Sequence, residues 1–145
     1  MKLRVCVVGK PKLLYAREGV EDYAERILRY TKFDLVTVRE GRREKEGERL
    51  LEASQGYLRV VLDERGQQVD TVVLKNKLEL WESHGEKGVA FLIGGADGHA
   101  EAVREAAVWT FALSKLTLQH ELALVVLLEQ LYRVETIKRR EPYHR

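Results

Sequence analysis

The sequence holds one cysteine, Cys6, and only two prolines among its 145 residues. A single cysteine excludes a disulfide framework and a cysteine-based zinc site. No window approaches the roughly 18–20 uninterrupted apolar residues that a membrane span requires. Arg4 interrupts the first apolar stretch, which is typical of a strand and not of a signal peptide. These absences favour a soluble, cytoplasmic protein that uses neither disulfides nor a membrane.

An excess of charge of one sign is also absent, because 25 Lys and Arg residues face 23 Asp and Glu residues, a formal net charge of +2. Any nucleic-acid-binding role must therefore come from local clustering of cations. The four histidines show no metal-ligand spacing such as H-E-x-x-H, and no G-x-S-x-G nucleophile motif occurs. We expect no metal site. A chain of this length predicts a single domain, residues 1–145.

What the sequence does contain is an alternation of short apolar runs and longer stretches with helical spacing. We expect strands at residues 3–8, 33–38, 57–62, 88–93 and 109–113. We expect helices at residues 13–30, 71–81, 101–107 and 121–134, and a charged loop at 39–49 leading into a short helix that ends near residue 56. The pattern predicts an α/β fold, a parallel-type sheet flanked by helices.

Three loops of this predicted sheet are candidates for a ligand site. In open α/β sheets, ligands bind beyond the carboxyl ends of the strands, and these loops follow Leu62, Ile93 and Leu113. The second loop, Gly94–Gly98, lets a ligand approach the backbone closely at the start of a helix. A tight strand-to-helix turn would explain the same glycines, and an ordinary connection would explain the polar break at Ser114.

The helix predicted at 121–134 begins with an unbroken apolar stretch, Leu122–Leu128. A helix that is apolar all round is buried all round. In a domain of this size one side faces the sheet, and the other most simply faces a second copy of the chain, which predicts a homodimer. A central helix within one compact fold is the alternative.

The end of the chain is its densest basic cluster, with Arg133, three cations at 138–140, and Tyr143, His144 and Arg145. Guanidinium groups pair with phosphates, and Tyr or His side chains stack on unpaired bases. The cluster therefore favours an RNA contact, and a solvated chain end is the plain alternative.

Several ordered motifs resemble one protein family. They are Leu62–Gly66 (LDERG), Phe91–Gly98 (FLIGGADG), Leu113–His120 (LSKLTLQH), Leu131–Arg133 (LYR) and the terminal Pro142–Arg145 (PYHR). Their combination runs from end to end of the chain. It resembles the SPOUT-class ribosomal RNA methyltransferases called RlmH.

This resemblance implies a sheet whose C-terminal part is threaded into a trefoil knot, a homodimer, and S-adenosylmethionine as methyl donor. It also implies methylation of N3 of a pseudouridine in 23S large-subunit ribosomal RNA, on assembled ribosomes. The family usually has proline where Ala96 and Gln119 stand in this chain. Carried over by position, the cofactor-binding residues are Leu62, Gly94, Gly95, Ser114, Lys115, Leu116, Thr117, Leu118 and Gln119.

The tail residues Tyr143, His144 and Arg145 resemble the family's substrate-side residues, with the tail of one subunit reaching the pocket of the other. Methyl transfer needs alignment of donor and acceptor and loss of the N3 proton. We expect His144, or a water that it holds, to assist that loss, and Arg145 and Arg133 to stabilise the imide anion or clamp a phosphate. Tyr143 could take either part. The alternatives are a SPOUT methyltransferase for another RNA position and a non-catalytic ribosome-associated module.

Overall fold

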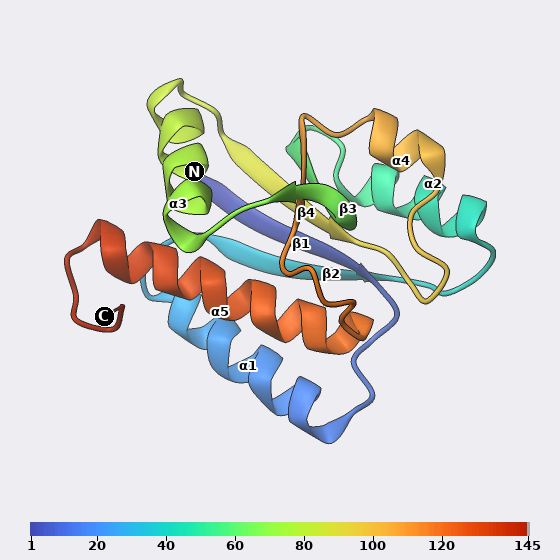
Figure 1. Cartoon of the computed structure of the whole chain (residues 1–145), viewed down its shortest axis with the longest axis horizontal. Helices are drawn as coiled ribbons and strands as arrows, with labels where there is room; N and C mark the ends of the chain where they lie inside the picture. Colours follow the sequence, from blue (N-terminus) through green and yellow to red (C-terminus); the bar gives the residue numbers. More distant parts are fainter. Residues whose placement is uncertain (145) are drawn as a thin grey trace.

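A computed structural model describes residues 1–144 as five strands and five helices (Figure 1). The strands are β1 Lys2–Val8, β2 Phe33–Val38, β3 Leu58–Gln68, β4 Gly88–Ile93 and β5 Trp109–Ala112. The helices are α1 Leu14–Leu28, α2 Arg43–Ala53, α3 Thr71–Ser83, α4 Glu101–Glu105 and α5 His120–Lys138. The strands pair in parallel in the order β2-β1-β4-β3-β5. Within the described residues, no helix combines the length and the apolar character needed to cross a membrane.

The sheet separates two apolar layers because successive side chains of a strand point to opposite faces. In β1, Val5 and Val7 contribute to the layer beneath α1, α3 and α5, whereas Cys6 and Val8 contribute to the layer beneath α2 and α4. Burial raises the pKa of the Cys6 thiol to about 12. Cys6 is therefore a core residue, as its place in a strand predicts.

Strand β3 continues past the point where the sequence predicts its end. Its pairing with β5 shifts register between Leu62 and Gln67, so that both of these residues lie opposite Phe111. Gly66 makes this possible, because a Cβ there would come within 2.8 Å of the Phe111 backbone nitrogen. The expected break at 63–66 is thus a bulge within one strand, and it projects polar side chains at the carboxyl edge of the sheet.

Two helices also differ from the prediction. Helix α2 begins at Arg43, inside the segment expected to be a loop, and α5 continues to Lys138. One chain does not bury α5 on every side: Leu124 and Leu127 are fully buried, but Leu122 is 36% exposed. The apolar side of α5 that faces away from the sheet is therefore open at its first turn.

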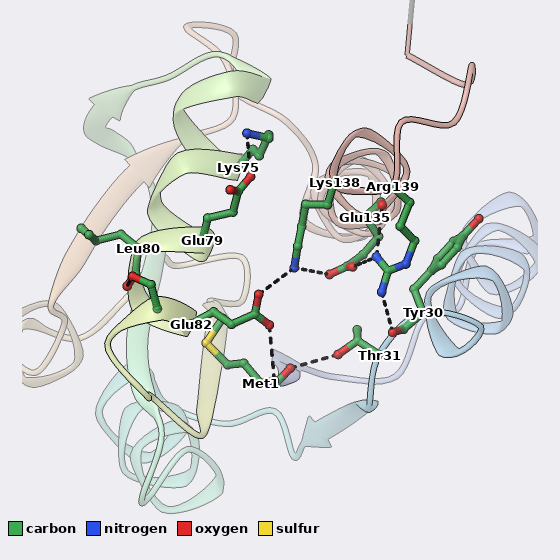
Figure 2. Close-up of polar contacts among 11 residues, drawn as sticks. Met1, Tyr30, Thr31, Lys75, Glu79, Leu80, Glu82, Glu135, Lys138 and Arg139 are labelled. Atoms are coloured by element: carbon green, nitrogen blue, oxygen red, sulfur yellow. Dashed lines mark hydrogen bonds and ion pairs between the residues drawn. The ribbon is translucent and has the colours of Figure 1, made fainter.

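The far end of α5 is tied to the N-terminus and to α3 by a chain of ion pairs (Figure 2). The Met1 amino group lies 3.5 Å from a Glu82 carboxylate oxygen, and Lys138 Nζ lies 3.1 Å from the other oxygen of Glu82. Lys138 also lies 3.7 Å from Glu135, which pairs with Arg139. Glu135 is the buried carboxylate of this chain of charges, with a side chain only 5% exposed.

Replacing Glu135 with alanine is expected to lower the free energy of unfolding by about 1–3 kcal/mol, because Lys138 and Arg139 would keep their charges without the carboxylate between them. Urea unfolding measures the loss. An exposed carboxylate on α1 provides the control, and Glu25→Ala should change stability by less than about 0.5 kcal/mol. Equal effects of the two substitutions would contradict a structural role for the network.

Candidate active site

A cavity of about 560 Å³ opens at the carboxyl edge of the sheet. Three loops form its walls: the bulged part of β3, the β4–α4 loop and the loop between β5 and α5. These are the three loops that the sheet topology predicts as a ligand site. Side chains from α2, α4 and the first turn of α5 complete the lining.

The β4–α4 loop folds back on itself through its glycines. Gly98 has a φ of +78°, which favours glycine, and its N–H donates to the Gly95 carbonyl at 3.0 Å. A Cβ on Gly94 would lie 3.0 Å from the Gly98 carbonyl carbon and 3.3 Å from the His99 nitrogen. Glycine at 94 is therefore required by the close return of the loop's own backbone.

Seven of the nine predicted cofactor residues line this cavity. They are Leu62, Gly94, Gly95, Ser114, Leu116, Thr117 and Leu118. The other two, Lys115 and Gln119, are not part of its wall as the structure describes it. Gln119 instead caps α5, since its side-chain oxygen accepts hydrogen bonds from the backbone nitrogens of Glu121 at 3.0 Å and Leu122 at 3.1 Å.

The β5–α5 loop is held over the cavity by two polar contacts. Thr117 Oγ1 donates to Glu64 at 2.6 Å, which joins the loop to the bulge of β3. Ser114 Oγ accepts from the backbone nitrogen of Leu116 at 2.9 Å. These contacts leave the Leu116 side chain 74% exposed at the rim.

Asp63 is a site residue that the sequence analysis missed. Its side chain is only 8% exposed and accepts hydrogen bonds from Arg65, with Nε at 3.2 Å and Nη2 at 3.1 Å. Burial by itself would raise the pKa of Asp63, but the hydrogen bonds from Arg65 outweigh it and leave the pKa below the usual value. The LDERG motif contains both residues, and the sequence identifies it as a candidate ligand loop and as a family motif without assigning a role to Asp63 or Arg65.

His99 is a second missed residue, and it lies in the cavity wall with 4% exposure. Its Nε2 donates to the Leu92 carbonyl at 3.1 Å, which places the ring proton on Nε2. No described residue supplies a hydrogen-bond partner for the buried Nδ1. Burial lowers the pKa of His99, although the charge of Asp63 and the carbonyls of Leu92 and Leu62 oppose this.

Because the folded-state pKa of His99 is depressed, its contribution to stability is complete above about pH 6.5, the unfolded value. As the pH falls from there toward the folded pKa, the unfolded chain binds a proton that the folded chain excludes, so stability falls. We expect His99→Gln to remove this loss in urea unfolding measured from pH 7.5 to pH 5. Exposed His84→Gln should retain it, and parallel pH profiles for His99→Gln and wild type would contradict the assignment.

The predicted catalytic residues lie elsewhere in the same chain. Arg133 is fourteen residues along α5 from Gln119, which corresponds to roughly 20 Å at 1.5 Å per residue. Tyr143 and His144 contact the α5 surface beside Arg133, at the opposite end of α5 from the β4–α4 loop (Figure 1). Arg145 lies outside the described residues. One chain therefore does not bring Tyr143 or His144 to its own cavity.

The tail is nevertheless ordered against α5 by specific contacts. Tyr143 donates to Glu129 at 2.8 Å and packs edge-on against Tyr132, with ring centroids 4.7 Å apart. Arg133 donates to His144 Nδ1 at 3.0 Å and lies over the Tyr143 ring. Burial, and then hydrogen bonds with Tyr23 and Glu129, raise the pKa of Tyr143. Tyr143 therefore stays protonated at neutral pH and acts as a hydrogen-bond donor.

The cavity suits S-adenosylmethionine in size and in chemistry. Its volume falls within the range of roughly 300–1,000 Å³ that is usual for small-molecule sites. Leu62, Ile93 and Leu118 supply apolar surface for an adenine ring. The unsatisfied Nδ1 of His99 offers a buried hydrogen-bond acceptor.

Comparisons with known proteins identify the family of this chain. A family model described as "Predicted SPOUT methyltransferase" matches residues 1–144. The chain is 57% identical over 145 residues to the ribosomal RNA large subunit methyltransferase H of Thermus thermophilus, covering 100% of this chain and 99% of that one. It is 41% identical to the protein of the same name from Deinococcus radiodurans, again over 100% of this chain and 99% of the relative.

Solved structures of low sequence identity share the fold. A probable methylase family protein from Haemophilus influenzae superposes with a TM-score of 0.64 at 9% identity, covering 99% of this chain and 70% of that one. The tRNA (m1G37) methyltransferase of Aquifex aeolicus gives a TM-score of 0.56 at 12% identity, covering 92% and 70% of the two chains. With an end-to-end family match and close relatives of the same length, this chain belongs to the SPOUT methyltransferase family.

Proposed function

We propose that this protein uses S-adenosylmethionine to methylate N3 of a pseudouridine in the 23S RNA of assembled large ribosomal subunits, in the cytoplasm. The observation that carries the proposal is a cavity walled by three strand-end loops in a chain that is 57% identical, end to end, to an rRNA large subunit methyltransferase. The trefoil knot that the sequence resemblance implies follows from the SPOUT fold.

Bound S-adenosylmethionine supplies an electrophilic methyl group on its sulfonium. Leu62 and the glycines at 94 and 95 would hold the nucleoside half, and residues 114–118 would close over it. The link between Thr117 and Glu64 keeps that closing loop against β3. Residues of the chain thus fix the direction of the methyl group, which is the main requirement of an in-line displacement.

The catalytic site is completed by a second copy of the chain. Leu14 is 63% exposed and Leu116 is 74% exposed. Leu14 is the first residue of α1. The beginning of α1 is held beside the beginning of α5, because Glu121 accepts hydrogen bonds from the backbone nitrogens of Lys12 and Leu13. An apolar surface therefore adjoins the cavity. A two-fold dimer with the two α5 helices antiparallel, its axis near the middle of α5 and this surface turned toward the partner, would bring each tail over the other subunit's cavity.

In such a dimer, tail residues of the second subunit would assist the loss of the N3 proton. Tyr143, which stays protonated, would donate to a uracil carbonyl and stabilise the imide anion with Arg133. His144 would accept the N3 proton, directly or through water, once Arg133 releases its Nδ1. His144 or water would carry away the N3 proton as N3 receives the methyl group that S-adenosylmethionine would supply, with the neutral thioether as the leaving group.

The test is transfer of labelled methyl from S-adenosylmethionine to ribosomes that lack this modification, followed by mass mapping of the 23S RNA. We expect one methyl group on one pseudouridine and much slower labelling of free 23S RNA. Label at another nucleotide would indicate a different SPOUT specificity. No label, together with no heat on titration with S-adenosylmethionine, would indicate a non-catalytic module.

A further inference from the structure

Three arginines from three different elements line the mouth of the cavity. Arg43 lies at the start of α2, Arg65 in the bulged part of β3, and Arg104 in α4. Their side chains are 50%, 67% and 33% exposed, respectively. The guanidinium groups therefore range from the solvent-facing rim toward the interior, and they come from segments that are distant in the sequence.

Asp63 fixes two of these guanidinium groups in place. It accepts from Nε and Nη2 of Arg65, and the Arg65 backbone nitrogen also donates to it at 2.9 Å. Arg104 Nη1 lies 3.8 Å from the same carboxylate and donates to the His99 carbonyl at 2.9 Å. One carboxylate, that of Asp63, thus holds two guanidinium groups. The three side chains together keep one uncompensated positive charge, and the two arginines keep N–H donors that a ligand can use.

The acidic residues of the rim do not balance this charge in the same place. Glu64 is engaged by Thr117 at 2.6 Å, on the β5–α5 side of the cavity. Asp97 lies in the exposed glycine loop. Among the described residues, the ion pair that Arg43 forms is with its chain neighbour Glu44, with 3.7 Å between Nη2 and the carboxylate oxygen. Such a separation at an exposed site contributes little binding energy, so Arg43 remains available.

We propose that Arg65 and Arg104, anchored by Asp63 and faced by Arg43, form a phosphate-binding subsite for the RNA backbone beside the target nucleotide. This inference rests on the proposed function. Planar guanidinium groups held in a fixed orientation bind phosphate oxygens through paired hydrogen bonds. The sulfonium and ammonium groups of the cofactor would meet like charge here, so its single carboxylate is the one cofactor group that could pair with these arginines, whereas RNA offers a phosphate at every nucleotide. The subsite would let a chain with a net charge of only +2 bind RNA phosphate through charge that is concentrated at one place.

The experiment compares Arg65→Gln and Arg104→Gln with Arg29→Gln, which removes one charge from an exposed position at the end of α1. For each protein, the KM for ribosomes is measured against KCl concentration, and the Kd for S-adenosylhomocysteine by calorimetry. We expect each cavity substitution to raise the KM severalfold and to reduce the slope of log KM against log[KCl] by about 1. The Kd and kcat should stay within about twofold of wild type. Arg104→Lys should keep the slope because it keeps the charge.

The opposite pattern would overturn the subsite. A weaker Kd for S-adenosylhomocysteine with an unchanged ribosome KM would assign the arginines to the cofactor, and unchanged values of both would deny them any ligand. Failure of the proposed function gives a different result, since wild type would then transfer no methyl. In that case, salt-dependent binding of the same variants to ribosomes by sedimentation still decides whether the arginines hold RNA.

Discussion

A mixture of two inactive variants should regain about one quarter of wild-type methylation. One variant, His144→Ala, lacks the tail imidazole, and the other, Gly94→Val, has a distorted cofactor loop and is inactive at an S-adenosylmethionine concentration near the wild-type Kd. Random exchange of subunits makes about half of the dimers mixed, and each mixed dimer contains one site built from an intact cavity and an intact tail. The reason is the separation of roughly 20 Å between Arg133 and the start of α5 in one chain.

Each variant is measured alone before mixing. His144→Ala should lower kcat for ribosome methylation by about 10²–10⁴-fold, the usual contribution of a general acid or base. His144 is exposed, so its removal leaves the fold intact, and thermal melting checks this. The exposed His84→Ala is the matched control. A mixture with no more activity than its components would show that tail and cavity act within one chain, and full activity of His144→Ala would remove it from the reaction.

Sequence patterns predict which loops meet at the cavity because they report on topology. Alternating strands and helices imply a parallel sheet, and a parallel sheet brings its carboxyl ends to one edge. For that reason the sequence alone predicts that the loops after Leu62, Ile93 and the fifth strand lie together, and the structure places all three in the wall of one cavity. The fully apolar strand at 88–93 is likewise buried throughout, as its composition predicts.

The same patterns do not predict which polar side chains meet at that edge. Asp63 reaches Arg104, 41 positions away, only because β3 bulges around Gly66 and continues along β5. A break in periodicity does not distinguish a loop from a bulge. The sequence does not indicate the place of His99 in the cavity wall, because that place depends on a hydrogen bond to the Leu92 carbonyl, and a backbone carbonyl carries no sequence signal.

The overall composition also does not predict that arginines gather at the cavity. A net charge of +2 averages over the whole surface, whereas recognition depends on charge that converges at one point. The basic tail was visible because its cations are consecutive. Arg43, Arg65 and Arg104 are spread over sixty residues, and the fold alone brings them to the same cavity.

Substitution of Gly94 should weaken cofactor binding in steps that follow the size of the added side chain. A Cβ at this position meets backbone atoms, the Gly98 carbonyl carbon at 3.0 Å and its oxygen at 3.1 Å, which cannot rotate away. The loop must shift to relieve this overlap, whose cost is about 1–3 kcal/mol. Binding would have to restore the loop and so lose that energy, and each 1.4 kcal/mol is tenfold in affinity. We therefore expect the Kd for S-adenosylhomocysteine to rise about tenfold in Gly94→Ala and about a hundredfold in Gly94→Val.

Two other glycines separate a backbone requirement from general disturbance of the surface. At Gly95 an added Cβ would meet side chains, Glu46 Oε1 at 3.1 Å and Val8 Cγ1 at 3.2 Å, which can shift by a few tenths of an ångström. Gly95→Ala should therefore weaken binding less than Gly94→Ala. At Gly41 the neighbour is the flexible end of Arg49, so Gly41→Ala should bind like wild type. Equal affinities for Gly94→Ala and Gly41→Ala, with both proteins folded, would mean that the turn at Gly94 does not shape the cofactor site.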